Sequence, residues 1–258
     1  MRREHLIQID TERCIGCGMC LRDCPQNNLS MEGGKAEVRS QNCMKCGHCV
    51  AVCPKAAVSI TGFEEPPAEI EGPALLEPRQ LLSAIQTRRT VRQFTTQPVG
   101  DEVLAQIIEA GRWTPSGKNA QDVSYVVLKD GLERCEQIAV RLFRKLMPAA
   151  KLVDKGISRV EIDDHFFFKK APAAIVVVSR DKINASLAAS NMELMAQAHG
   201  LGVLYSGLFA MAANHSPKLR GALGMARGER VVTTLVLGYP GVRYHRTAQK
   251  EAAIVRYL

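Results

Sequence analysis

The chain has 258 residues, 46% of them hydrophobic, which is enough for one medium core plus a small second domain and excludes extensive disorder. A formal net charge of +8 could suit a polyanion, but aromatic residues make up only 5% of the sequence, so no stacking platform for nucleic acid is expected. The sequence holds no run of eighteen apolar residues, and MRREHLIQID lacks the pattern of a secretory signal. We therefore expect a cytoplasmic protein without nucleic-acid or membrane partners.

Two stretches of the chain repeat one cysteine pattern. CIGCGMCLRDCPQ begins at Cys14, CMKCGHCVAVCPK begins at Cys43, and both follow C-x2-C-x2-C-x3-C-P. Three closely spaced thiolates can hold one face of a 4Fe-4S cubane, and the fourth ligand must then come from the partner motif, after the turn at its proline. The pattern predicts two clusters with crossed ligands: Cys14, Cys17, Cys20 and Cys53 for the first, and Cys43, Cys46, Cys49 and Cys24 for the second.

Structural zinc is the alternative for these cysteines, but it would leave the third and fourth cysteine of each set, and both prolines, without a role. Dense cysteine in a reducing compartment indicates metal or redox chemistry rather than disulfides. Two loaded clusters of about −2 each would reduce the net charge to about +4, so the basic excess is modest. The 29-residue repeat resembles the bacterial two-cluster ferredoxins over residues 1–62.

Residues 63–80 form a Pro- and Glu-rich stretch that predicts a semi-rigid linker. Beyond it, apolar residues at helical spacing predict helices near residues 81–85, 103–111 and 132–146, while β-branched runs predict strands that begin at Val123, Ala173 and Val231. A helix of small residues is predicted from Asn184 to His199. Cys135 lies on an apolar helix face, where a buried hydrophobe is favoured over a reactive thiol. Neither a Rossmann fingerprint nor a P-loop occurs.

Three stretches of the second region together resemble the FMN-dependent nitroreductase family. They are RRTVRQF from Arg88, TPSGKNAQ from Thr114, and AHGLGVLYSG from Ala198, which is followed by LRGALG and LVLGYP. The resemblance implies an α+β fold, a ferredoxin-type domain followed over residues 81–258 by a mixed sheet surrounded by helices. It also implies FMN as a cofactor and a homodimer whose partner subunit supplies part of each flavin site. The implied FMN contacts are Arg88, Arg89, Thr90, Arg92, Pro115, Ser116, Lys118, Asn119, Gln121, Ser206, Gly207, Arg246 and Lys250.

The first two of these stretches also have a simpler interpretation. Arginines near Arg88 suit a flavin phosphate through charge-assisted hydrogen bonds, but they also suit a solvated basic helix end. The Thr114–Gln121 stretch can be an ordinary surface loop, and Asp122 and Val123 depart from the proline and aromatic residue that usually follow in the family. Residues 154–170 lie where the family varies its pocket covers, although the run Phe166–Phe168 within them is favoured as core.

The fusion predicts an iron–sulfur flavoprotein oxidoreductase. Clusters move single electrons, while FMN can collect two and release them to a small oxidised acceptor, nitroaromatic or quinone-like. An external ferredoxin or another low-potential donor is the expected source of electrons, and no protein nucleophile is expected. Two alternatives remain: a non-enzymatic electron carrier, and a flavoenzyme of the same fold that runs another reaction, such as reductive dehalogenation.

Overall fold

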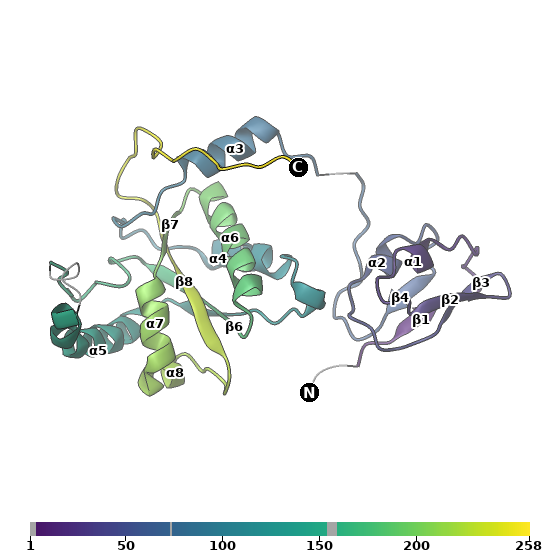
Figure 1. Ribbon diagram of the computed structural model, residues 1–258, viewed down its shortest axis with the longest axis horizontal. Helices are drawn as coiled ribbons and strands as arrows, with labels where there is room; N and C mark the ends of the chain where they lie inside the picture. Colours follow the sequence, from purple (N-terminus) through teal and green to yellow (C-terminus); the bar gives the residue numbers. More distant parts are fainter. Residues whose placement is uncertain (1–3, 73, 154–158) are drawn as a thin grey trace. The chain divides into compact units, whose positions relative to one another are not determined.

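The computed structural model describes residues 4–72, 74–153 and 159–258, apart from the side chains of residues 149–153. The chain divides into two compact units (Figure 1): Met1–Leu75 with Gly117–Ala120, and Leu76–Ser116 with Gln121–Leu258. Residues 154–158, which belong to the predicted pocket cover, lie outside the described residues. Among the described helices, none has the length and apolar character needed to cross a bilayer.

The first unit follows the cysteine repeat. Its elements are β1 (Ile7–Ile9), α1 (Met19–Arg22), β2 (Leu29–Glu32), β3 (Lys35–Val38), α2 (His48–Ala51), β4 (Val58–Ile60) and the 3-10 turn η1 (Gly117–Asn119). β1 pairs with β4 and β2 with β3, both antiparallel. Each repeat therefore contributes a strand, a ligand loop, a one-turn helix and a second strand.

Both one-turn helices begin at a left-handed glycine. Gly18 precedes α1 with φ 68°, and Gly47 precedes α2 with φ 75°. A side chain at either position would be strained, because residues other than glycine rarely adopt this backbone conformation. The glycine after the second cysteine of each motif thus turns the chain so that the third cysteine enters the helix.

The second unit is built on a four-stranded sheet of order β5-β6-β8-β7. The strands are β5 (Ser124–Leu128), β6 (Ala173–Ser179), β7 (Gly202–Tyr205) and β8 (Arg230–Gly238), and all three pairings between them are antiparallel. Thr90 adds a parallel bridge to Val203 at the β7 edge. That bridge makes the sheet mixed, as predicted.

Helices cover both faces of this sheet. They are α3 (Pro78–Thr87), α4 (Asp101–Arg112), α5 (Leu132–Val153), α6 (Lys182–Ala198), α7 (Gly207–His215) and α8 (Pro217–Ala222). Every residue of β6 is buried, and its side chains alternate between two cores. Val176 packs in a core with residues of α5, α7 and α8, whereas Ile175 packs in a core with residues of α4 and α6. The second unit is therefore a three-layer α/β/α structure.

The predicted interior residues lie where the sequence places them. Cys135 is buried on α5 with 3% of its surface exposed, and burial raises the pKa of its thiol. Phe167 and Phe168 are fully buried, with Phe166 packed against the same core, so the core interpretation of this run is confirmed. The segment 63–72 and 74–77 has no helix or strand and is exposed throughout.

Candidate functional site

Thiols surround two small cavities in the first unit. One cavity is lined by the first predicted set, Cys14, Cys17, Cys20 and Cys53. The other is lined by the second set, Cys43, Cys46, Cys49 and Cys24. In both cavities the fourth cysteine comes from the other motif, which is the crossed arrangement that the spacing predicts.

Backbone amides donate to one or more sulfurs in each set. Ala36 N lies 3.4 Å from Cys14 Sγ and Ala57 N lies 3.2 Å from Cys53 Sγ at the first cavity. At the second cavity the corresponding donors are Asn28 N, 3.4 Å from Cys24 Sγ, and Lys45 N, 3.2 Å from Cys43 Sγ. Such N–H···S bonds stabilise anionic sulfur and therefore suit ligands of a negatively charged cluster.

The thiols that line one cavity are close enough to affect one another's pKa. Burial raises the pKa of Cys49 to about 11, and the neighbouring Cys43, Cys24 and Cys46 add to the rise. Four thiolates this close together need a cationic metal centre to be ionised at once. No three His, Cys, Asp or Glu side chains among the described residues converge on a position for a single metal ion. The thiols are instead spaced around a cavity, and this donor set fits a four-iron cluster.

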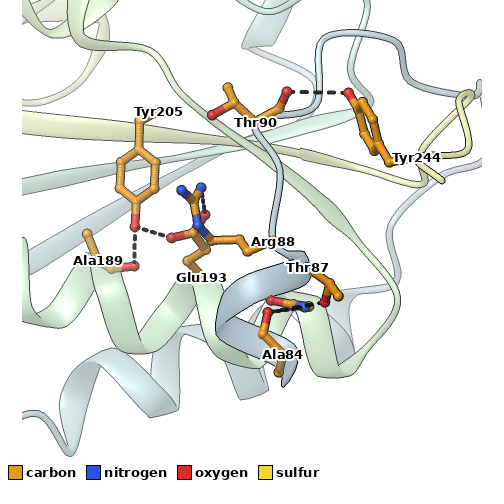
Figure 2. A network of polar contacts seen from close by, with 9 residues as sticks. Ala84, Thr87, Arg88, Thr90, Ala189, Glu193, Tyr205 and Tyr244 are labelled. Carbon is orange, nitrogen blue, oxygen red and sulfur yellow. Dashed lines mark hydrogen bonds and ion pairs between the residues drawn. The ribbon is translucent and has the colours of Figure 1, made fainter. Parts of the chain in front are cut away.

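Arg88, the first predicted flavin ligand, belongs to a buried polar network in the second unit (Figure 2). Its Nη1 lies 2.9 Å from Glu193 Oε1 on α6, and the Tyr205 hydroxyl lies 3.0 Å from Glu193 Oε2 and 3.1 Å from Ala189 O. The side chain of Glu193 is 10% exposed. Burial raises the pKa of Tyr205, and the Glu193 carboxylate beside it adds to the rise. Tyr205 therefore stays a neutral donor, and Arg88 neutralises the buried carboxylate.

The residues after Arg88 run along the β7 edge. Val91 N donates to Val203 O at 3.0 Å, beside the Thr90 bridge. Tyr244, from the C-terminal segment, contacts this run, with its hydroxyl 3.5 Å from Thr90 O (Figure 2). The guanidinium carbon of Arg89 lies over the Tyr244 ring, 5.3 Å from the ring centroid. Neither Arg89 nor Arg92 forms an ion pair within the described part of the chain. Their charges fit an anionic phosphate.

The Thr114–Gln121 stretch contains three left-handed residues that are not glycine. Lys118, Asn119 and Gln121 have φ values of 53°, 50° and 46°. Backbone of this kind is costly and is concentrated in ligand-binding loops. Ser116 Oγ accepts from Gln121 N at 3.0 Å, which closes the loop. Within the first unit, Asn119 Nδ2 donates to the carbonyl oxygens of Met44 and Lys45, at 3.0 and 2.8 Å.

The remaining predicted contacts fall in two places. Ser206 is buried as the residue before α7, and its N–H donates to Thr234 O at 2.8 Å, while Gly207 is exposed at the first position of that helix. Arg246 and Lys250 lie on the exposed C-terminal segment and make no hydrogen bond or ion pair within the described residues. The structure thus brings Arg88–Arg92 next to the strand that leads into Ser206, while Arg246 and Lys250 have no hydrogen bond or ion pair with these described residues.

In the sequence, Asp122 stands out only as a departure from the family pattern. Its carboxylate accepts from Ser179 Oγ and from Asn184 Nδ2, both at 2.7 Å, and so ties the end of the loop to β6 and α6. Burial raises the pKa of Asp122, but these two hydrogen bonds, together with backbone N–H donors, outweigh burial and leave the pKa below its ordinary value. The only sequence signal for this role of Asp122 is an acidic residue placed directly before a strand that is rich in β-branched residues.

Glu193 and Tyr244 were missed altogether. Glu193 is an acid on a predicted helix of small, mostly buried residues, and such an acid indicates a buried partner. Tyr244 lies in a stretch interpreted only for its basic residues. Neither residue has a local pattern that predicts contact with the Arg88 segment.

Comparison with known proteins agrees with both units. A model of the nitroreductase family matches residues 85–239, and a model of a 4Fe-4S dicluster domain matches residues 6–54. An Archaeoglobus fulgidus protein, provisionally named an NADH dehydrogenase/NAD(P)H nitroreductase, is 25% identical over 171 residues, which cover 62% of this chain and 86% of that protein. Iodotyrosine deiodinase of Hydra vulgaris is 27% identical over 179 residues, 61% of this chain and 64% of its own length.

A solved structure shares the fold of the second unit. The nitroreductase with bound FMN from Bacteroides fragilis is 20% identical and has a TM-score of 0.57, covering 69% of this chain and 98% of its own. At this identity the likeness shows the fold alone. Because the family model spans more than half of the sequence, the chain belongs to the nitroreductase family and carries a 4Fe-4S dicluster domain ahead of its nitroreductase domain.

Proposed function

We propose that this protein is an FMN-dependent oxidoreductase that passes electrons from two 4Fe-4S clusters to a small oxidised acceptor, nitroaromatic or quinone-like. The observation that carries the proposal is the presence, in one chain of the nitroreductase family, of two cavities that are each lined by four thiols. When bound, the clusters supply one-electron transfer and FMN supplies the conversion to two-electron chemistry. Cysteine ligands of this kind suit the reducing cytoplasm.

Different residues of the chain are proposed to bind the phosphate and the ring of FMN. Arg89 and Arg92 supply positive charge for the phosphate, and Thr90 supplies a hydroxyl. Arg88 keeps donors for the flavin while one of its nitrogens holds Glu193, because a guanidinium has five N–H groups. The backbone at Ser206 and Gly207 lies at the end of β7, where a flavin ring can approach it without meeting a side chain at Gly207.

We propose that the active form is a homodimer in which the Thr114–Gln121 loop reaches the flavin of the other subunit, with Pro115, Lys118, Asn119 and Gln121 as contacts. Large apolar side chains exposed on several elements support this proposal: Leu82, Ile85, Ile183, Leu187, Leu208, Met211, Ile254 and Tyr257. Burying such groups between two copies is the usual way a C2 dimer of this size is stabilised. Arg246 and Lys250, on the exposed C-terminal segment, are proposed phosphate contacts.

The first test is cofactor content together with a phosphate-site variant. Protein purified without oxygen should contain about eight iron atoms per chain and release FMN on denaturation. Arg92→Gln should weaken FMN binding about tenfold or more, since a hydrogen bond to a charged group contributes about 1.5–3 kcal/mol. Arg227→Gln, at another exposed arginine, is the matched control and should bind FMN like the parent. Zinc in place of iron, or absence of FMN, would refute the proposal.

The second test separates the enzyme from a simple electron carrier. Cys46→Ser should damage the second cluster and leave FMN bound, because the second unit has its own core. Stopped-flow reduction of the flavin by reduced ferredoxin should then slow sharply, while chemically pre-reduced protein should still reduce a nitroaromatic at the parent rate. Equal rates of flavin reduction in variant and parent would show that the clusters do not feed the flavin.

Reductive dehalogenation is a second candidate reaction, favoured by the similarity to iodotyrosine deiodinases of Hydra vulgaris and Nematostella vectensis. Both candidates use the same electron path and differ only in the acceptor. Steady-state assays with a nitroaromatic and with an iodinated phenol, under one ferredoxin supply, distinguish them. Iodide release at a higher kcat/KM than nitro reduction would favour the second candidate.

A further inference from the structure

The internal repeat allows the surroundings of the two thiol cavities to be compared position by position. A shift of 29 residues superposes the first cysteine motif on the second in sequence, Cys14 on Cys43 and Cys24 on Cys53. Each cavity has two backbone N–H groups within hydrogen-bond distance of a ligand sulfur, and at the first cavity the Gly16 N–H also acts on Cys14. Side chains outside the ligand set are a further source of electrical difference between the two sites.

Three cationic side chains lie at the first cavity. Lys35 Nζ donates to the carbonyl oxygen of Cys14, and Arg22 Nη1 donates to the carbonyl oxygen of Cys17 at 3.3 Å. Lys55 lines the same cavity, directly after Cys53 and Pro54. Lys35 is half-buried, while Arg22 and Lys55 are exposed. The charge of Lys35 is therefore the least screened of the three.

The equivalent positions around the second cavity carry no charge. Leu6 stands where the repeat has Lys35, Ala51 where it has Arg22, and Gln26 where it has Lys55. Gln26 lines the second cavity as Lys55 lines the first, and its Oε1 accepts from Met44 N at 2.7 Å. The repeat thus keeps the ligands and changes the charge beside them.

Basic residues also lie near the second cavity, and Arg39 is one of them, beside Gln26 and Asn28. His48 lines the cavity, and its Nδ1 lies 3.2 Å from the carboxylate of Asp23, which brings a negative charge to this side. Lys45 follows the ligand Cys43, but its side chain is not among those that line the cavity. Among the described residues, no lysine or arginine lines the second cavity.

We infer that Lys35, Arg22 and Lys55 give the first 4Fe-4S site the higher reduction potential of the two. Reduction adds one electron to a site and neither forms nor breaks a bond; in a titration the electron comes from a low-potential chemical donor. The added negative charge is attracted by nearby cations, so the reduced form is favoured where cations are close. The inference rests on the proposed loading of both cavities, and iron content tests that loading separately.

The test is an anaerobic potentiometric titration of the holoprotein at low ionic strength, in which the electron paramagnetic resonance signal of the reduced clusters is followed. Two neighbouring sites repel each other's electrons and give two waves even when they are identical, so the deciding observation is which wave moves. A triple variant replaces the three cations with the residue types found at the equivalent positions of the second site: Lys35→Leu, Arg22→Ala and Lys55→Gln. The midpoint potential of its upper wave should fall by about 59 mV or more, which is a tenfold change in equilibrium constant for one electron. The midpoint potential of its lower wave should not change.

Ala51→Arg is the reciprocal variant. It adds a cation at the exposed position equivalent to Arg22 and removes no native contact, so it decides the question even if the triple variant binds less iron. Its lower wave should rise, and high salt should reduce the rise because exposed charges are screened. The inference is overturned if the triple variant shifts the lower wave, or if either variant keeps its full iron content and shifts no wave.

Discussion

Glu136 is a carboxyl group inside the core of the second unit, with 2% of its surface exposed. Its Oε1 accepts from Phe167 N at 3.0 Å and from Phe168 N at 2.6 Å, and its Oε2 lies 3.6 Å from His165 Nδ1. Burial raises the pKa of Glu136, and the Phe168 N–H opposes part of that rise. A single side chain of α5 therefore anchors the turn that places two phenylalanines in the core.

Two substitutions of Glu136 separate its hydrogen bonds from its charge. Glu136→Ala leaves two buried N–H groups without an acceptor and should lower the free energy of unfolding by about 2–3 kcal/mol. Glu136→Gln keeps an oxygen for both donors and should cost less than about 1 kcal/mol. Urea unfolding measures both values. Equal losses in the two variants would contradict this role.

The raised pKa of Glu136 also predicts that the stability of the protein depends on pH. The folded-state pKa of Glu136 lies above its ordinary value of 4.5, so its contribution to stability is fully present below that value and is lost as pH rises through the folded-state pKa. The parent should therefore lose more stability than Glu136→Gln as the pH rises above 4.5. Parallel pH profiles for the two proteins would show that the carboxyl does not titrate in this way.

At the scale of elements, the proposed flavin segment depends on the close approach of two backbones at the β7 edge. A Cβ added at Gly202 would lie 2.5 Å from Val91 Cγ2 and 2.8 Å from Val91 Cβ. Real Cβ atoms do not approach that closely, so a side chain at Gly202 must push the Arg88–Arg92 segment away from β7. The bridge between Thr90 and Val203 would then break first.

Gly202→Ala should therefore cost about 1–3 kcal/mol of stability and weaken FMN binding together with it. Val91→Ala alone leaves a small cavity, and in the double variant it removes the 2.5 Å contact with Cγ2 but keeps the 2.8 Å contact with Cβ. The double variant should therefore be more stable than the sum of the two single effects allows, and it should recover part of the FMN affinity. Gly221→Ala in α8, where an added Cβ meets nothing within 4 Å, is the control and should be neutral or slightly stabilising. Additive single effects would contradict the contact.

Much of this architecture can be predicted from local pattern. The apolar period of residues 132–146 predicts α5, and the β-branched run from Ala173 predicts β6, because both signals are contained in a few turns or one strand. The cysteine spacing predicts for the same reason which four cysteines line each cavity. The Arg88–Glu193 pair could not be predicted, since 105 residues separate its members and only the packing of α3 against α6 brings them together.

At the scale of the whole molecule, the two units are stabilised in different ways. The second unit has two aliphatic cores, one on each face of its sheet. The first unit has one small core, and three of the residues buried in it are the predicted cluster ligands Cys14, Cys20 and Cys49. Much of the first unit's interior is therefore made of predicted iron ligands, and domains of this size often need a metal to fold.

Iron removal should consequently unfold one unit and spare the other. After chelation under mildly acidic, anaerobic conditions, hydrogen exchange followed by mass spectrometry should show loss of protection in β1–β4 and unchanged protection in β6, β8 and α6. Rebuilding the clusters with iron and sulfide should restore the first set. Protected β1–β4 amides in iron-free protein would disprove this dependence.

The ligand cysteines in that small core have a further consequence for the life of the protein in a cell. A chain made while iron is scarce would display an unfolded first unit, joined by the exposed residues 63–72 and 74–77 to a second unit that is already folded. Proteases act on unfolded segments and exposed linkers, so such chains would be trimmed or degraded before they could accumulate as flavoproteins without the proposed electron supply. The abundance of the intact chain would then report the iron status of the cell, without any dedicated sensor.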